Sequence, residues 1–309
     1  MLMAQAVDKR TTPDEPLQRV ETASGEGSAY RTYVISFLLV VIFVLLWEGL
    51  KLFGRANNYE IGLFGSTINL SIFNNTKLPH TYDIIKAFGE PAQRNGPPLI
   101  QELIKFGAFT LGEAVLGFAI GAVIGFILAV LFAHSSLMQR GVLPYVIASQ
   151  TVPILAIAPM VVIWMRNAGV PSLAVPIIAA YLTFFPVTIY TLRGLTSVPQ
   201  TSLELMQTYA ASQWEILFKL RLPNALPQIF TALKISATAS VVGAIIGELP
   251  SGIQDGLGIA ILNFTQFYNQ SPPRLWAAIV ASALVGILFF SVVALVERFV
   301  IRWEVEESL

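Results

Sequence analysis

Long apolar runs alternate with shorter polar segments along the chain, and this pattern predicts membrane-spanning helices. The run 114–133 carries no charged residue, and about twenty apolar residues is the length an α-helix needs to cross the hydrocarbon core. Comparable runs follow the same pattern at 34–52, 142–165, 173–192, 229–246 and 275–296. The sequence therefore predicts an all-α polytopic membrane protein with about six transmembrane helices.

Composition supports this class and argues against several others. Hydrophobic residues make up 55% of the chain and charged residues 12%, about half the charged fraction of a soluble domain. Lysine plus arginine equals aspartate plus glutamate at 19 each, so no basic field suggests a nucleic-acid partner. The chain has no cysteine, and only His80 and His134 as histidines, so we expect no metal site.

The polar segments divide the chain into four regions. We expect residues 1–30 to be a flexible cytoplasmic tail and 31–105 to hold the first span and an extracytoplasmic loop with short interfacial helices. Residues 106–300 then form the membrane core, and 301–309 a cytoplasmic tail. With the N-terminal tail placed in the cytoplasm, six spans across the plasma (inner) membrane put the C-terminus on the cytoplasmic side too. On this topology eleven of the 19 Lys and Arg lie inside, a weak positive-inside bias.

One polar segment between two apolar runs has helical spacing. It reads "ELMQTYAASQWEILFKLRLPNALP" (204–227) and predicts a short amphipathic helix outside the bilayer, over about 203–222. Glu215 and Lys219 stand four residues apart in the favourable order for an exposed ion pair. Pro223 and Pro227 lack backbone donors, so we expect them to end this helix before the next span. Trp214 suits either a protein interface or an anchor at the lipid headgroups.

Further stretches accompany this segment: "TLGEAVLGFAIGAVIGFILAVLFAHS" (110–135), "LPYVIASQTVPILAIAPMVVIW" (143–164), "FFPVTIYTLRGL" (184–195) and "TALKISATASVVGAIIGELPSG" (231–252). Together they resemble the permease subunits of binding-protein-dependent ABC importers. The similar branch is that of the nitrate, sulfonate, taurine, bicarbonate and pyrimidine-precursor systems. The resemblance covers about 100–300 and implies the type I permease fold.

In that family a cytoplasmic loop with a Glu-Ala-Ala…Gly signature docks on a separate ATPase. The resemblance assigns this coupling role to Glu204, Ala210, Ser212, Trp214, Leu222 and Pro223. Ala210 stands where the family has Gly. Because a Cβ strains a positive φ, we expect either a helical backbone at Ala210 or a bend taken up by a neighbour.

The resemblance also implies the partners. These are an ABC ATPase subunit, an extracytoplasmic solute-binding protein, a second permease copy in a homodimer, and membrane lipid. The sequence contains no Gly-x-x-x-x-Gly-Lys-Ser/Thr phosphate loop. We therefore expect no catalysis and no cofactor on this chain, with ATP and Mg²⁺ bound by the partner ATPase.

Polar groups and prolines at membrane depth mark candidates for the solute pathway. Gln150, Thr151 and Pro153 interrupt the third apolar run and could line a cavity, or form a kink in which Gln150 bonds a neighbouring helix. Phe185 could contact solute or belong to the core. Glu248 could face the pathway as part of a gate or cap the outer interface.

A repeat of small residues concerns helix packing. Gly117, Gly121 and Gly125 repeat every four residues, which favours close helix–helix contact over a pathway role.

The function that the resemblance implies is passage of a solute coupled to a separate ATPase. The solute would be a small heterocycle, such as a thiamine-pyrimidine precursor or a riboflavin-like molecule, or a small anion (nitrate, sulfonate, taurine or bicarbonate). The alternative is a self-powered secondary transporter, but such proteins carry ionisable groups inside their spans, and runs 114–133 and 173–192 have none.

Overall fold

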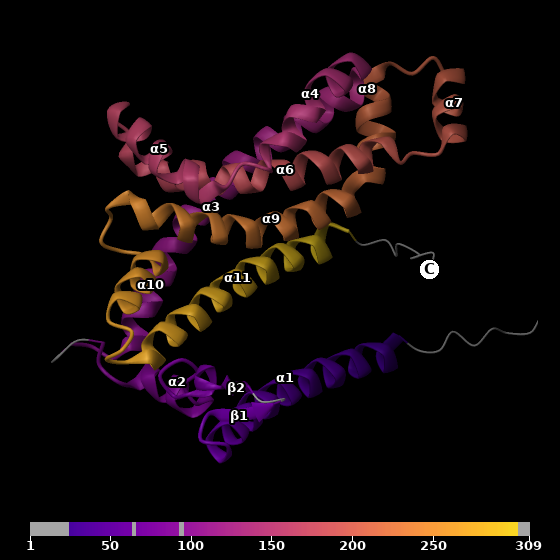
Figure 1. The fold of residues 1–309 in the computed structure, drawn as a ribbon. Helices are drawn as coiled ribbons and strands as arrows, with labels where there is room; N and C mark the ends of the chain where they lie inside the picture. The colour runs from indigo at the N-terminus through magenta and orange to yellow at the C-terminus, as the bar shows by residue number, and fades with distance from the viewer. Residues whose placement is uncertain (1–24, 64–65, 93–95, 302–309) are drawn as a thin grey trace, which may run out of the picture.

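The computed structural model describes residues 25–63, 66–92 and 96–301, and the chain there forms a helical bundle with one small hairpin (Figure 1). The outer segments are α1 (Gly25–Ala56), β1 (Glu60–Leu63), β2 (Ser66–Asn69), η1 (Ser71–Phe73) and α2 (Thr81–Gly89). The core follows with α3 (Leu99–His134), α4 (Ser136–Ser149), α5 (Ile154–Asn167), η2 (Pro171–Leu173) and α6 (Ala174–Thr196). The remainder is α7 (Gln200–Thr208), α8 (Gln213–Ile216), the π-helical turn η3 (Leu217–Arg221), α9 (Leu222–Ser251), α10 (Leu257–Gln266) and α11 (Pro272–Val300).

Within these residues, five helices are long and apolar enough to cross a membrane, in agreement with five of the predicted spans. The third predicted span differs. Residues 142–165 form the bent pair α4 and α5, whose axes meet at 99°, so the sixth span is a broken one. Pro153 caps α5 at this break, because it lacks the donor that a continuous helix would use.

Helices α3, α6 and α9 pack closely at the centre of the bundle. Small residues on α3 allow this contact: a Cβ built on Gly121 would lie 2.6 Å from the Ala180 carbonyl oxygen, and one on Gly125 would lie 2.6 Å from that of Phe184. The prediction that this glycine face serves packing is confirmed. Backbone approach of this kind lets the helices gain dispersion contacts that lipid tails cannot replace.

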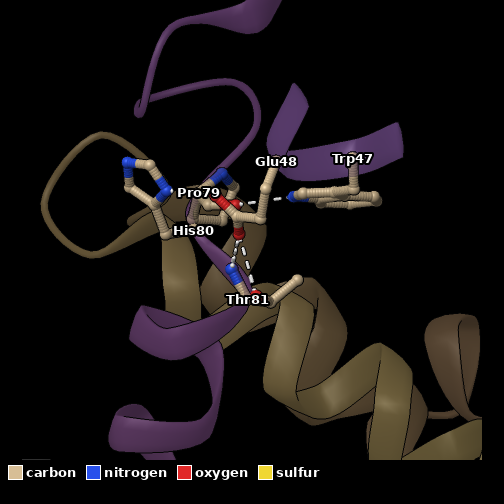
Figure 2. Close-up of polar contacts among 5 residues, drawn as sticks. All are labelled: Trp47, Glu48, Pro79, His80 and Thr81. Atoms are coloured by element: carbon tan, nitrogen blue, oxygen red, sulfur yellow. Dashed lines mark hydrogen bonds and ion pairs between the residues drawn. The ribbon is translucent and has the colours of Figure 1, made fainter. Parts of the chain in front are cut away.

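Helix α1 lies apart from the central helices and is attached near its C-terminal end (Figure 1). The indole of Trp47 donates to Pro79 O at 3.0 Å and meets the Trp276 ring edge-on at 5.1 Å. Beside it, the Glu48 carboxylate accepts from both Thr81 N (2.9 Å) and Thr81 Oγ1 (2.8 Å) (Figure 2). Glu48 therefore caps α2, and this cap joins α1 to the loop region.

The predicted boundaries shift in three places. Helix α1 begins at Gly25, inside the segment expected to be a flexible tail, while residues 1–24 lie outside the described residues. The loop region contains one short amphipathic helix, α2, and an antiparallel hairpin that the sequence analysis did not predict. Helix α3 starts at Leu99 and so crosses the boundary expected at 105 between the loop and the membrane core. Its first turns contain Leu103, Ile104 and Phe106.

The bundle has two distinct ends. Helices α7 and α8 lie at one end, together with the start of α1 and the end of α11, whereas β1, α2 and α10 lie at the other (Figure 1). An ion pair between Lys234 and Glu297, at 2.6 Å, joins α9 to α11 toward the α8 end. Residues 302–309 lie outside the described part of the chain.

Candidate coupling segment and transport pathway

The segment expected to be one helix is divided at Ala210. Helix α7 ends at Thr208, and Ala210 adopts a left-handed backbone with φ +52°. Ala210 N donates to Gln207 O and Ala211 N to Met206 O, at 2.8 and 3.0 Å, the paired bonds of a Schellman cap. Both expectations for Ala210 are therefore wrong: the alanine itself makes the turn usually made by glycine.

The chain then re-enters a helix at Ser212. Ser212 Oγ accepts from Glu215 N, and the Glu215 side chain accepts from Ser212 N at 2.9 Å, which forms a capping box. Lys219 Nζ donates to Glu215 Oε1 at 3.0 Å, so the predicted ion pair is confirmed. This cap fixes where the second helix begins.

The two prolines do not end this helix. Residues Gln213–Ser251 run continuously through α8, η3 and α9, with Pro223 in the first turn of α9 and Pro227 inside it. Leu222 N donates to Leu217 O across the π turn, which widens the backbone just before Pro223. The expected helix end is thus wrong, because the wider turn accommodates the missing donor.

Two polar contacts tie the start of α9 to the central helices. Arg221 Nη1 donates to Ala133 O in the last turn of α3 at 2.9 Å, and Asn224 Nδ2 donates to Ser197 Oγ beyond α6 at 3.1 Å. Leu222 is half-buried and Pro223 exposed. The N-terminal end of α9 is therefore held to α3 and to the segment after α6.

Trp214 projects from the first turn of α8 with 63% of its surface exposed. Its ring lies 5.5 Å from that of His134 and stacks on Phe218 at 6.1 Å. An apolar groove beside it is lined by Ile127 and Leu131 of α3. This exposure suits both roles considered for Trp214, a protein contact and a lipid anchor.

Glu204 is exposed on α7 and accepts from Gln200 Nε2 at 3.2 Å. Of the coupling candidates, Glu204 therefore lies on α7, and Ala210 lies in the turn that ends α7. The helix that begins at the Ser212 cap carries Trp214, Leu222 and Pro223.

The pathway candidates fall in separate places. Gln150, Thr151 and Pro153 are all exposed at the α4–α5 break. Thr151 Oγ1 bonds Ala148 O within its own turn, and Gln150 makes no side-chain hydrogen bond to another described residue. The Tyr181 hydroxyl donates to Ser149 O, which fixes the break against α6. The role of the break in a pathway stays a prediction.

Phe185 is half-buried among apolar side chains that include Leu192 and Leu195. Its neighbour Phe184 lies 5.8 Å from the Tyr181 ring. Phe185 thus belongs to a packed cluster within the single chain, and its contact with solute stays a prediction.

Glu248 is fully buried in the last turns of α9. Its carboxyl group accepts from Thr110 Oγ1 at 2.7 Å and from Gly258 N at 2.6 Å. The side chain therefore points into the junction of α3, α9 and α10. Because Glu248 is buried and bonds the start of α10, it could influence a pathway only by setting the position of α10.

A hollow of about 520 Å³ lies between the N-terminal part of α3, α10 and the start of α11. Aromatic rings of Phe106, Phe264 and Phe267 and the polar groups of Asn263 and Glu102 line it. The hollow gives this end of the bundle a concave surface.

No set of three metal-ligating His, Cys, Asp or Glu side chains gathers within residues 25–63, 66–92 and 96–301.

Comparison with known proteins finds a protein family that matches this chain. Residues 121–302 match the family described as "Binding-protein-dependent transport system inner membrane component". The chain belongs to this permease family. The matched residues include α4 to α11 and the C-terminal part of α3, so both the divided segment at 200–222 and the broken span lie inside the family region.

Individual relatives agree with this membership. A formylaminopyrimidine transport permease protein, ThiX, of Halalkalibacterium halodurans is 34% identical over 195 residues, which are 63% of this chain and 75% of that protein. A riboflavin transport system permease protein, RibX, of Chloroflexus aurantiacus is 31% identical over 172 residues, 56% of this chain and 62% of that protein. A putative aliphatic sulfonates transport permease protein, SsuC, of Bacillus subtilis is 29% identical over 234 residues, covering 76% and 80%.

A solved structure supports the fold. A chain from the crystal structure of an amino acid ABC transporter with histidines aligns with a TM-score of 0.51 at 19% identity, covering 64% of this chain and 94% of that one. The permease is thus an all-α membrane protein of the type I fold, as predicted.

The sequence analysis missed two polar contacts that organise the permease. Glu48 was visible only as a charge inside an apolar run, although it caps α2. Thr110 gave no signal, because a lone threonine at the start of an apolar helix is ordinary, yet its hydroxyl joins three helices.

Proposed function

We propose that this permease forms the solute pathway of an ABC importer and couples it to ATP hydrolysis on a separate subunit. The observation that supports this most is the continuity of Gln213–Ser251. One helix carries the exposed Trp214 at one end and reaches the opposite end of the bundle with its other (Figure 1). A displacement of α7 and α8 by a moving ATPase would therefore tilt a central helix of the bundle.

The proposed coupling surface comprises α7 and the first turn of α8. Glu204 and Trp214 are exposed there, while Arg221 and Asn224 hold the segment to α3 and to the end of α6. A partner that binds the exposed side chains can therefore move the membrane helices rather than only bend a loop. ATP and Mg²⁺ belong to that partner.

Three further partners complete the proposal. A second copy of the chain completes the pathway, lipid surrounds the apolar helices, and a solute-binding protein delivers solute at the end that carries α10. We propose the inner membrane as the location, with both termini in the cytoplasm. The start of α1 and the end of α11 share the end of the bundle that carries α7 and α8 (Figure 1).

For the solute we propose a small heterocycle of the pyrimidine-precursor or riboflavin type, with a small anion such as nitrate, a sulfonate, taurine or bicarbonate as the second class. The printed names of two relatives above 30% identity, formylaminopyrimidine and riboflavin permeases, favour the heterocycle. A sulfonate permease at 29% identity keeps the anion class open.

Co-purification from mild detergent tests the proposal. Tagged wild-type chain should bring down a cassette ATPase in equal copy number. Replacing Glu204 and Trp214 together by Ala should reduce that ATPase, whereas Tyr145→Ala, an exposed aromatic substitution on α4, should not. A homo-oligomer without an ATPase that still moved solute in liposomes would contradict the proposal and favour a secondary transporter.

A further inference from the structure

The outer end of α9 is joined to the short helix α10 by a buried carboxyl group. Helix α9 ends at Ser251, and after a turn through Gly252, with φ +74°, and Gly256, the chain enters α10 at Leu257. Helix α10 has ten residues and so is too short to span a bilayer, which needs about twenty. Its position must therefore be set by its contacts with longer helices.

Glu248 and Thr110 provide those contacts at the N-terminus of α10. Glu248 accepts from Gly258 N at 2.6 Å, and Thr110 Oγ1 accepts from Leu257 N at 2.9 Å. Thr110 Oγ1 in turn donates to Glu248 Oε1 at 2.7 Å. Two backbone donors that a helix start leaves unpaired are thus bound by side chains of α9 and α3.

The α9–α10 junction is buried and closely packed. Glu248 and Thr110 are both fully buried, and hydrogen bonds in such surroundings are strengthened by the low local dielectric. A Cβ on Gly256 would lie 2.5 Å from the Glu248 carboxyl carbon, and one on Gly258 would lie 2.4 Å from Ile245 O. The α10 backbone is therefore pressed directly onto α9.

The other face of α10 is open. Asn263, Gln266 and Phe267 are exposed there, and Phe267 is 58% accessible. At its opposite end the same continuous helix that carries Glu248 begins beside Trp214. A partner pressing on α10 would thus act on one end of a helix whose other end lies in the proposed coupling surface.

We propose that Glu248 and Thr110 lock α10 to α9 as one rigid body, so that contact at the outer surface is carried to α7 and α8 by α9. This inference rests on the proposed importer function and adds a positioning role for two fully buried residues. Glu248 is the positioning residue of α9, and Thr110 fixes the same body to α3.

Spin-label distances test the rigid body directly. Because the chain has no cysteine, Asn263→Cys on α10 and Val242→Cys on α9, both at exposed positions, can be labelled without further changes. In the assembled transporter, diluted with unlabelled chain, the distance should be the same without nucleotide and with trapped Mg-ATP. A distance that changes between these states in the otherwise native chain would overturn the proposal.

Substitutions at the junction give a second test. Glu248→Leu removes both acceptor oxygens, so the Thr110 hydroxyl and the Gly258 N–H each lose their partner. Removing a bond of this kind shifts an equilibrium by about tenfold. We expect Glu248→Leu and Thr110→Val to lower stimulation of ATPase activity by the binding protein about tenfold, with basal activity kept.

Matched variants separate coupling from folding. Thr110→Ser retains the hydroxyl and should keep stimulation. Asp255→Asn breaks the exposed Lys105 pair (2.7 Å) on the same turn and should leave stimulation unchanged. If the native complex is stimulated and Thr110→Val responds equally, the rigid-body inference fails alone. A native chain with no ATPase partner would instead refute the importer function.

Discussion

The Trp214 indole lies 5.5 Å from the His134 imidazole, so the first turn of α8 rests against the last turn of α3. The contact leaves 63% of Trp214 exposed, which makes it available to a partner while its base is held. A large aromatic side chain placed in this way is the kind that dominates binding energy at protein interfaces.

We therefore expect Trp214→Ala to reduce the solute accumulated per ATP hydrolysed, because truncating such an anchor commonly costs about 2 kcal/mol or more of binding. Trp214→Phe, which keeps a ring in place, should retain most of the coupling. Uptake and phosphate release measured in the same vesicles would show the ratio. Equal ratios for all three proteins would remove Trp214 from the coupling surface.

A fluorescence measurement separates the two roles of Trp214. In a chain whose other tryptophans are replaced by Phe, brominated phospholipids should quench Trp214 less once the ATPase is bound. Quenching that stays unchanged in the complex would identify the indole as a lipid anchor.

Ala210 should gain stability when replaced by glycine. Its φ of +52° places the Cβ close to the backbone, a strain of about 1–2 kcal/mol that glycine removes. Because glycine also makes the unfolded chain more flexible, the net gain in free energy of unfolding should be about 0.5–1 kcal/mol. Ala211→Gly, at a residue without positive φ, is the control and should lower stability. A loss of stability in Ala210→Gly would contradict the left-handed turn.

Glu48 should be needed to hold α1 in place. Glu48→Ala leaves Thr81 N without its acceptor, and loss of a helix cap typically costs about 1 kcal/mol. The Thr81 amide should then exchange with solvent faster, which hydrogen exchange can measure. Glu90→Ala removes only the exposed Lys86 pair at 3.4 Å and should leave the Thr81 amide unchanged. Slow exchange retained in Glu48→Ala would show that another group caps α2.

The glycine face of α3 offers a matched pair of substitutions. Gly121→Ala puts a Cβ 2.6 Å from Ala180 O, and overpacking of this kind costs about 1–3 kcal/mol. Gly112→Ala on the same helix has no atom within 4 Å of the new Cβ, so helix propensity should make it neutral or stabilising. Thermal unfolding in detergent should rank the two variants in this order, and the reverse order would refute the close contact of α3 with α6.

Sequence patterns predicted the spans well because bilayer thickness sets helix length directly. The glycine repeat on α3 was equally informative, since only small residues at that spacing let backbones meet. The family motifs pointed to the segment that we propose as the coupling surface, and the Glu215–Lys219 pair follows from local helical spacing alone.

Other features depended on tertiary contacts that local patterns do not contain. Pro223 predicted a helix end, but the helix continues through the π turn before it and past both prolines. The alanine at position 210 predicted either a helical backbone there or a bend at a neighbour, although the Schellman bonds hold Ala210 itself in the left-handed conformation. Glu248 could be recognised as a charge at the end of an apolar run, whereas its burial and its partner Thr110, 138 residues away, became evident only in the folded chain.

ATP-driven uptake in sealed proteoliposomes tests the importer function most directly. Vesicles containing the chain and its co-purified ATPase would receive binding protein and labelled aminopyrimidine or riboflavin outside, with nitrate and taurine as the anion probes, and ATP inside. The importer function predicts accumulation of one probe that requires both ATP and the binding protein and persists when ion gradients are dissipated. Accumulation that needs an ion gradient and proceeds without the ATPase would contradict it.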